Sequence, residues 1–386
     1  MTISPVAPHV LWYIGAVDGE VPWDPRHAEV ATFDDLRRQA QNLDRLGYYG
    51  ALTTAREPIA LIGATERLRF VIPEYPGVKP PALLAEQAQV FDNYSGGRLI
   101  FNQVNGADPV LARYGRYESK DQRYELSKEY WRQVRSLYLD DTEPFDGDYL
   151  SYGRRHKPAI AGTRQPGGVP VWGTGASPAG IDHATAVLDV YLSFMGSPQT
   201  TADLFGRVRA AASDAGRELR FGVLASVIVR ETEDEAWERF EWQLANTSPD
   251  AVLATADRNL RSFGFPPLDE ITSSDQQVQA RIDALRAGRL PTRDELQFGP
   301  NMVAGLTTWT SAEPPFDIAG KGTGNYLVGS AENVATRIRE MSELAGIDYW
   351  ILSGWPLIGE AQITADLLFP LLNVRTPSPS ARALAT

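Results

Sequence analysis

Two amides stand at the end of a segment that otherwise has the pattern of a buried strand. Residues 98–106 begin with an apolar run and then carry Asn102 and Asn105 where a core strand favours Val or Leu. In parallel α/β folds, ligands bind at the carboxyl ends of the strands. The amides therefore predict a ligand contact at this strand end, and the alternative is that they only cap the turn at Gly106.

The glycine-rich segment 174–180 is a second candidate, because it lies between a predicted strand and a predicted helix. Exposed N–H groups at a helix start, together with the Ser177 hydroxyl, suit an anion such as a phosphate. The spacing is neither a dinucleotide fingerprint nor a P-loop, and Ser177 alternatively serves only as an N-cap before Pro178. Segment 320–324, with Lys321, also suits an anion, and a flexible lid is the other interpretation.

Aromatic side chains near predicted strands form a third group. Trp12 and Tyr13 lie in the first predicted strand, and Trp355 follows the last one. Such rings can wall a flat ligand at the mouth of a barrel, although buried aromatics more often belong to the core. Arg56 and Glu57, after the second strand, can form a surface ion pair, which is worth little. No Ser-His-Asp, HExxH or paired-carboxylate pattern stands out.

The composition narrows the class of protein. The 386 residues carry a formal net charge of −12, which disfavours nucleic acid as a partner because phosphate neutralisation needs a basic face. The absence of cysteine excludes disulfides and thiolate chemistry, and the four histidines lack metal-ligand spacing, so we expect no metal. No apolar run of about 18 residues and no signal-peptide pattern occur, so we expect a cytoplasmic protein without a membrane span.

Eight apolar segments alternate with helical patterns along the chain. The predicted strands cover residues 10–15, 48–54, 68–73, 98–106, 169–173, 188–194, 219–229 and 349–353. This alternation predicts an α/β fold, a (β/α)8 TIM barrel in a single domain of residues 1–375, with a doubly wound open sheet as the alternative. Residues 246–324 interrupt the rhythm after strand seven and are predicted to form an insertion or lid, and residues 376–386 a disordered tail.

Several segments resemble, in collinear order, the bacterial luciferase-like flavin-dependent monooxygenases, and most closely their alkanesulfonate monooxygenase branch. The resemblance covers nearly the whole chain and rests on residues 95–106, 122–125, 175–180, 221–222, 227–232, 345–348, 352–354 and 367–372. It implies a (β/α)8 barrel that forms a homodimer or homotetramer. It also implies FMN as the cofactor, received as FMNH2 from a separate NAD(P)H:flavin reductase, and O2 as the oxidant of a small organic substrate.

The resemblance also assigns residues to the cofactor. It places the flavin ring near Asn105, with Asn102 on the same strand, and the FMN phosphate near Tyr124, Gly175, Ala176 and Ser177. Lys120, four residues before Tyr124, occupies a position where relatives often carry histidine. A lysine there can still pair with phosphate as a point charge.

The substrate side departs from the sulfonate enzymes. Where they carry a histidine this chain has Val17, their cysteine after strand two falls in segment 55–58, and their Arg-x-His on strand seven is residues 224–226. Their tyrosine after strand eight is Trp355, and their lid arginine aligns near Gly320, beside Lys321. Losing these groups disfavours a sulfonate, because an anion entering a dry pocket needs paired charges.

We therefore expect a less anionic, larger or aromatic substrate. The residues expected to line its site are Trp12, Tyr13, Ser226 and Trp355, and the candidates for proton transfer are Tyr75, Arg56 and Lys321. Three other functions stay open: hydride transfer with the deazaflavin F420 in the same barrel, flavin binding without turnover, and desulfonation through different groups.

Overall fold

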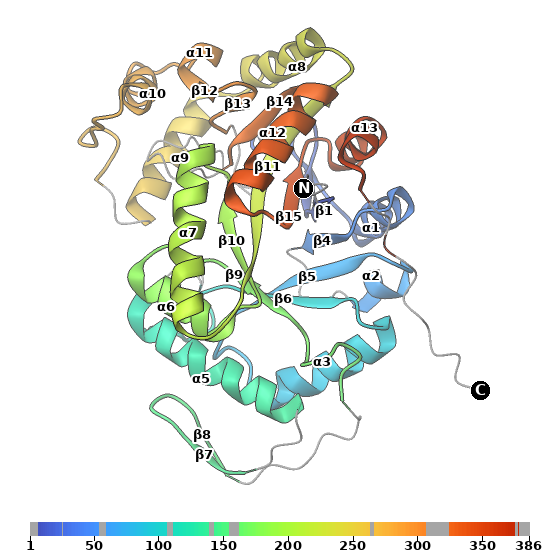
Figure 1. The fold of residues 1–386 in the computed structure, drawn as a ribbon. Coiled ribbons are helices and arrows are strands. Elements are labelled where there is room, and N and C mark those ends of the chain that lie inside the picture. Colours follow the sequence, from blue (N-terminus) through green and yellow to red (C-terminus); the bar gives the residue numbers. More distant parts are fainter. Residues whose placement is uncertain are drawn as a thin grey trace, which may run out of the picture. The chain divides into compact units, whose positions relative to one another are not determined.

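The computed structural model describes residues 7–24, 26–53, 59–105, 111–138, 143–153, 162–262, 266–305, 324–374 and 377. The chain divides into two compact units, each made of parallel strands and the helices that follow them (Figure 1). Unit 1 comprises residues 1–54, 193–203 and 222–376, and unit 2 comprises residues 55–192, 204–221 and 377–386. The predictions for Arg56, Gly320, Lys321 and most of the tail lie outside the described residues.

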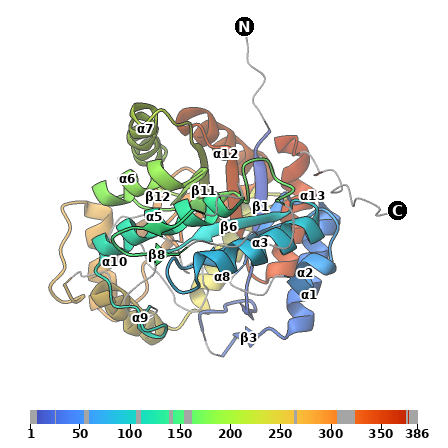
Figure 2. The ribbon, with the colours of Figure 1, turned by 90° about the horizontal axis from the view of Figure 1, so that it is seen from below.

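Unit 2 is a run of parallel strands in the order β10-β9-β6-β5. Its strands are β5 (Arg69–Glu74), β6 (Leu99–Gln103), β9 (Val171–Gly173) and most of β10 (Val190–Phe194). Its described helices are α2 (Ile59–Gly63), α3 (Pro81–Ser95), α5 (Lys120–Tyr138), α6 (Pro178–Val187) and the larger part of α7 (Pro198–Asp214). Strands β7 (Phe145–Asp146) and β8 (Ser151–Tyr152) pair antiparallel as a small separate sheet. Figures 1 and 2 show α5 beside α3, and α5 also packs against α6.

Unit 1 has the strand order β4-β1-β15-β11-β14 with a short antiparallel extension. These strands are β1 (His9–Ile14), β4 (Gly50–Thr53), β11 (Arg220–Arg230), β14 (Tyr326–Ser330) and β15 (Tyr349–Ser353), with the small pair β2 (Val17–Asp18) and β3 (Glu29–Val30) beside them in sequence. The helices are α1 (Phe33–Leu46), α8 (Glu233–Ala245), α12 (Ala331–Ala345) and α13 (Leu357–Leu372). The predicted insertion contributes α9 (Pro249–Ser262), α10 (Gln276–Arg286), α11 (Arg293–Leu296), β12 (Gln297–Gly299) and β13 (Met302–Val303).

Helix α1 shows why the sequence patterns locate helices well. Thr32 caps its start and forms a reciprocal capping box with Asp35, and Gly47 ends it in the left-handed conformation with φ of 85°. The helix buries Ala40 and Leu43 on one face, as an amphipathic pattern predicts. The capping residues and the buried face therefore account for the limits of α1 at residues 33–46.

One strand was not predicted. Residues 326–330 lie outside the eight predicted strands, yet they form β14, which pairs parallel to the second half of β11. Strand β11 is long enough to serve two partners, because residues 222–226 pair with β15 and residues 226–230 pair with β14. A pattern of continuous burial reports that a strand is covered on both faces, but it does not report how many neighbours the strand has.

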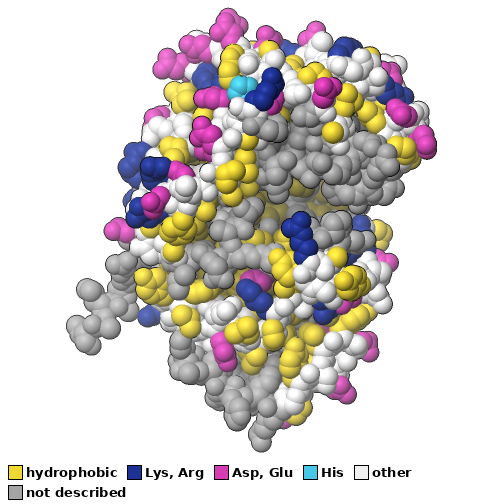
Figure 3. Space-filling model, turned by 180° about the vertical axis from the view of Figure 1, so that it is seen from behind, with side chains coloured by type: hydrophobic (Ala, Val, Ile, Leu, Met, Phe, Trp, Pro, Cys, Tyr) yellow, Lys and Arg dark blue, Asp and Glu magenta, His cyan; other side chains and the backbone are white. Residues whose placement is uncertain are grey.

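Two further features concern the hydropathy of the helices and the charge on the surface. None of the described helices is both long and apolar enough to cross a membrane. On the face drawn in Figure 3, lysine and arginine side chains are interspersed with aspartate and glutamate, so the acidic excess is distributed among basic groups there.

The Glu233 carboxylate links the start of α8 to the segments of unit 1 that surround β14. Its carboxylate accepts hydrogen bonds from Trp237 Nε1 at 2.9 Å, Asn301 Nδ2 at 2.6 Å, Asn333 Nδ2 at 2.8 Å and the backbone N–H of Ser330 at 2.8 Å. Burial of the carboxylate opposes ionisation, but these donors outweigh it and lower the pKa of Glu233.

We expect Glu233→Gln to lower the free energy of unfolding by about 1–3 kcal/mol near pH 7, because an amide cannot accept from all four donors. Because the folded pKa is lowered, the carboxylate stabilises the fold above its ordinary value of 4.5 and loses this effect as the pH falls through the folded pKa. Urea unfolding of the wild type and of Glu233→Gln should therefore show a difference in free energy of unfolding that becomes smaller in acid. Glu238→Gln, exposed on the same helix, is the control, and an equal effect of both changes would contradict the assignment.

Candidate active site

The start of α6 offers bare backbone to a ligand. Ser177 is the N-cap, and its Oγ accepts a hydrogen bond from the N–H of Gly180 at 3.1 Å, with Pro178 as the first helical residue. Gly175 and Gly180 touch backbone to backbone: a Cβ on Gly175, whose φ is 153°, would lie 2.9 Å from Gly180 Cα. A side chain is thus excluded at positions 175 and 180, and Ser177 does form the N-cap that the alternative interpretation expects.

Tyr191 on β10 holds this loop, although nothing in its sequence context singles it out. Its phenol Oη donates a hydrogen bond to the carbonyl of Gly175 at 3.1 Å. Burial raises the pKa of Tyr191, and the neighbouring Tyr124 phenol raises it further, so Tyr191 is a neutral hydrogen-bond donor. The only signal in the sequence was a tyrosine within a predicted apolar strand.

Tyr124 and His183 connect α5 with α6. Their ring centroids are 5.3 Å apart, Tyr124 is buried, and His183 Nε2 shares a hydrogen bond of 2.8 Å with Ser127 Oγ. Burial lowers the pKa of His183 to about 4, and the nearby Lys128 ammonium acts in the same direction. Lys120, one turn before Tyr124, is exposed at the first residue of α5.

Asn105 carries an unused donor. It follows β6, its Oδ1 accepts a hydrogen bond from Gln103 Nε2 at 2.5 Å, and its buried Nδ2 has no partner among the described residues. A small pocket beside it is lined by Pro76, Val104, Leu111, Arg116, Glu118, Arg123 and Leu126. Asn102 lies on β6 itself, half-buried and in register with Pro73 and Trp172.

Tyr75 directly follows β5 and lies in an aromatic pair. Its ring stacks on Tyr114 with centroids 6.3 Å apart. Arg56 and Lys321, the other two candidates for proton transfer, lie outside the described residues, so the structure places only Tyr75 of these three.

The residues predicted for the substrate side lie in unit 1 and are buried. The Trp12 ring lies 5.6 Å from Tyr48, which in turn contacts Phe369 of α13, so Trp12 makes contacts typical of the strand–helix core. Tyr13 is the next residue and so points to the opposite face of β1. Ser226 on β11 and Ser353 on β15 share a hydrogen bond of 3.1 Å between their hydroxyls.

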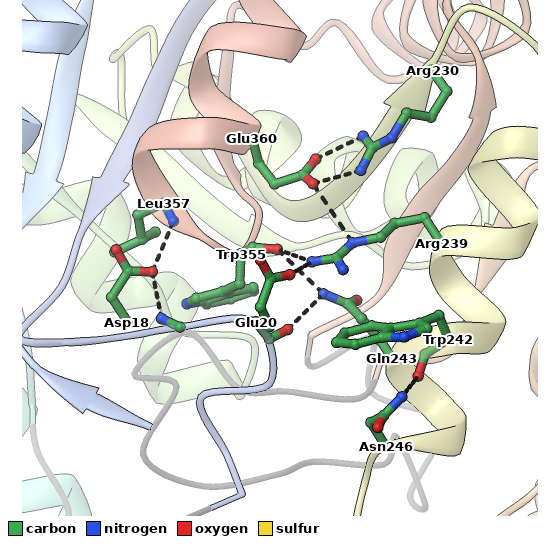
Figure 4. Close-up of polar contacts among 11 residues, drawn as sticks. Asp18, Glu20, Arg230, Arg239, Trp242, Gln243, Asn246, Trp355, Leu357 and Glu360 are labelled. Atoms are coloured by element: carbon green, nitrogen blue, oxygen red, sulfur yellow. Dashed lines mark hydrogen bonds and ion pairs between the residues drawn. The ribbon is translucent and has the colours of Figure 1, made fainter. Parts of the chain in front are cut away.

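Trp355 follows β15 and meets Trp23 edge to face, with ring centroids 6.0 Å apart. The charged groups around it are paired, as Figure 4 shows: Glu360 binds Arg230 through two hydrogen bonds of 2.6 and 2.9 Å, and Arg239 pairs with Glu20. This part of unit 1 therefore combines aromatic rings and hydroxyls with cations that already have carboxylate partners.

The residues of unit 2 fit FMN on two observations. The start of α6 offers the Ser177 hydroxyl and backbone without a side chain at positions 175 and 180, which suits a phosphate. The unpaired Nδ2 of Asn105 is a donor suited to a carbonyl or ring nitrogen of an isoalloxazine.

The same fold occurs in solved structures of flavin and deazaflavin enzymes. Riboflavin lyase RcaE, solved with modified FMN and riboflavin, is 17% identical, with a TM-score of 0.73 over 97% of this chain and 94% of that one. The long-chain alkane monooxygenase LadA is 18% identical, with a TM-score of 0.72 over 95% and 91%. An F420-dependent secondary alcohol dehydrogenase is 15% identical, with a TM-score of 0.61 over 95% and 99%. The predicted fold class, a (β/α)8 barrel of the luciferase-like type, is confirmed.

The family follows from the sequence comparison. The luciferase-like monooxygenase family matches residues 15–349, and the chain belongs to this family. The predicted enzyme class, a monooxygenase and hence an oxidoreductase, is confirmed. The alkanesulfonate branch stays a prediction.

His183 should make the fold sensitive to acid. Between pH 6.5 and about 4 the unfolded chain binds a proton that the folded chain excludes, so stability should fall by about 3 kcal/mol over this range. His183→Asn should show a smaller loss between near-neutral and acid pH in denaturant unfolding. A loss of the same size in both proteins would show that His183 is not the group responsible.

Proposed function

We propose that this protein is a two-component monooxygenase, which takes FMNH2 from a separate NAD(P)H:flavin reductase and uses O2 to oxygenate a weakly anionic or neutral organic substrate. The observation that carries the proposal is the start of α6, where Gly175 and Gly180 present backbone without side chains and Ser177 places its hydroxyl at the N-cap, an arrangement that supports a phosphate site. Membership of the luciferase-like monooxygenase family supports the reaction class.

The residues proposed to hold the cofactor belong to unit 2. Backbone N–H groups at residues 175–177, the Ser177 hydroxyl and the Tyr124 phenol would hold the phosphate, with Lys120 as an exposed point charge nearby in sequence. Asn105 would orient the ring, and Asn102 would line the strand beneath it. When bound, reduced FMN supplies two electrons and reacts with O2, while the chain binds, orients and excludes water.

The substrate side is proposed to accept a molecule with little negative charge. Tyr13, Ser226 and Trp355 supply rings and hydroxyls, and Arg239 and Arg230 are engaged with carboxylates. Trp12 would contribute mainly by supporting β1, given its contact with Tyr48. Tyr75, Arg56 and Lys321 remain the proposed proton-transfer candidates, and we propose a homodimer or homotetramer as the assembly.

A second candidate is an oxidoreductase that uses F420. It is favoured by the fold shared with an F420-dependent secondary alcohol dehydrogenase, and because F420 also carries a phosphate that a helix start can bind. Titration of the protein with FMN and with F420 separates the two. Tighter binding of F420, with reoxidation of bound FMNH2 by O2 no different from that of free FMNH2, would overturn the monooxygenase proposal.

Ser177→Asp tests the phosphate assignment. Aspartate caps a helix as well as serine does, so α6 should persist, but its carboxylate should repel a phosphate. We expect the affinity for FMN to fall about tenfold or more, from the repulsion of like charges at close range. Riboflavin, which lacks the phosphate, should bind the variant and the wild type equally in a flavin-fluorescence titration.

Ser177→Thr is the matched control, since it keeps a neutral hydroxyl at the cap. It should leave both affinities close to those of the wild type. If Ser177→Asp left FMN binding unchanged, or weakened riboflavin binding equally, the phosphate would not lie at the start of α6.

A further inference from the structure

Two side chains of α8 grip the carbonyl of Trp355. Arg239 Nη2 donates to this oxygen at 2.7 Å, and Gln243 Nε2 donates to it at 3.3 Å. The residue lies in the turn between β15 and α13, so α8 fixes the backbone from which the Trp355 indole projects (Figure 4).

The same two side chains also hold the segment after β1. Arg239 pairs with the Glu20 carboxylate, and Gln243 Nε2 donates to the Glu20 carbonyl at 3.1 Å. Asp18 connects this segment to α13, because its Oδ1 accepts the N–H of Leu357 at 2.8 Å. Three segments that are distant in sequence thus meet at Arg239 and Gln243.

The end of helix α8 also holds the ring of Trp23, which packs against Trp355. Trp23 Nε1 donates to Thr247 Oγ1 at 2.9 Å, and Thr247 Oγ1 donates back to the Gln243 carbonyl at 2.7 Å. The edge-to-face contact between Trp23 and Trp355, with an interplanar angle of 89°, therefore has both rings tied to the end of one helix.

The arginine at position 239 is suited to this task and a lysine is not. The Nη2 atom of Arg239 donates to the Trp355 carbonyl and pairs with the Glu20 carboxylate. Its Nε lies 3.8 Å from Glu360 Oε1, and its guanidinium carbon lies 4.9 Å from the centre of the Trp242 ring. A planar group with several donors can serve these acceptors together, whereas an ammonium is a single point. The Glu20 side chain is half exposed, and ion pairs at the surface contribute little to stability, so specific placement is the better explanation of the Arg239–Glu20 pair.

We propose that Arg239 is a positioning residue, which sets the orientation of Trp355 against Trp23 at the carboxyl end of β15. The inference rests on the proposed function in one respect, namely that Trp355 lines the substrate side. It adds a specificity-determining residue that never needs to touch the substrate, because Arg239 acts through the Trp355 carbonyl.

The test compares Arg239→Gln with Arg230→Gln in the full chain, each with and without Trp355→Phe. Both changes remove a cation that faces Glu360, but the hydrogen bonds of Arg230 in the described part of the chain go to Glu360 and the Val229 carbonyl, so Arg230 is the matched control. The readout is the part of the near-ultraviolet circular dichroism that Trp355→Phe abolishes, which reports the geometry of the tryptophan pair. We expect Arg239→Gln to lose most of this signal and Arg230→Gln to keep it.

Hydrogen exchange supplies a second readout. Backbone amides of residues 17–24 should exchange about tenfold faster in Arg239→Gln, because a hydrogen-bonded ion pair that holds this segment is lost. They should exchange at the wild-type rate in Arg230→Gln. If Arg239→Gln does not fold, Arg239→Lys takes its place, since it keeps the charge and loses the fork; it should also lose the Trp355 signal.

The proposal is overturned if the variant at position 239 keeps the Trp355 signal, or if the control loses it equally. Neither readout requires a bound cofactor. Failure to bind FMN would therefore count against the proposed function alone, and failure of the dichroism test against Arg239 alone.

Discussion

Parallel strand pairing is the constraint on which the candidate site depends. Within unit 2, the parallel register of Pro73, Asn102 and Trp172 places the carboxyl ends of β5, β6 and β9 next to one another. Tyr75 and the loop at 174–177 directly follow two of those ends, and Asn105 lies two residues after the third, so residues about 30–100 positions apart in sequence reach one edge of the sheet. Strand hydrogen bonds satisfy the backbone inside the sheet, and the polar groups just beyond it are the ones that can serve a ligand.

The sequence predicted elements well where a local rule applied. Thr32 before α1 and Gly47 after it are recognisable cap residues, and apolar runs mark the buried strands. It missed β14 because residues 326–330 form a short run whose pairing is decided by β11, about 100 positions earlier. The first half of β11 pairs with β15 and its second half pairs with β14. Such pairing is a tertiary property that apolar periodicity does not encode.

The same limit applies to the site. Asn105 and Ser177 could be predicted because an amide at a strand end and a serine before a helix are unusual in their own sequence context. Tyr191 and Arg239 could not, since a tyrosine in an apolar strand and an arginine in an amphipathic helix are ordinary there. Their importance comes from the carbonyls they reach, Gly175 and Trp355, and the second of these is 116 residues away from its donor.

Electrostatics distinguishes the groups at the start of α6 in unit 2 from those around Trp355 in unit 1. At the start of α6 the donors are neutral, namely backbone N–H groups, a serine hydroxyl and phenols, and such donors can bind a phosphate without displacing any existing charge partner. Around Trp355 the opposite holds, because Arg230 and Arg239 are both committed to carboxylates. An anionic substrate would have to separate one of these pairs and leave Glu20 or Glu360 unpaired, and Glu360 is only 3% exposed. Breaking a buried pair costs about 3–5 kcal/mol, which an anion would have to recover from the same arginine. A neutral ligand that packs against the rings and uses the hydroxyls around Trp355 meets no such cost, and this favours a neutral ligand over an anion in this part of unit 1.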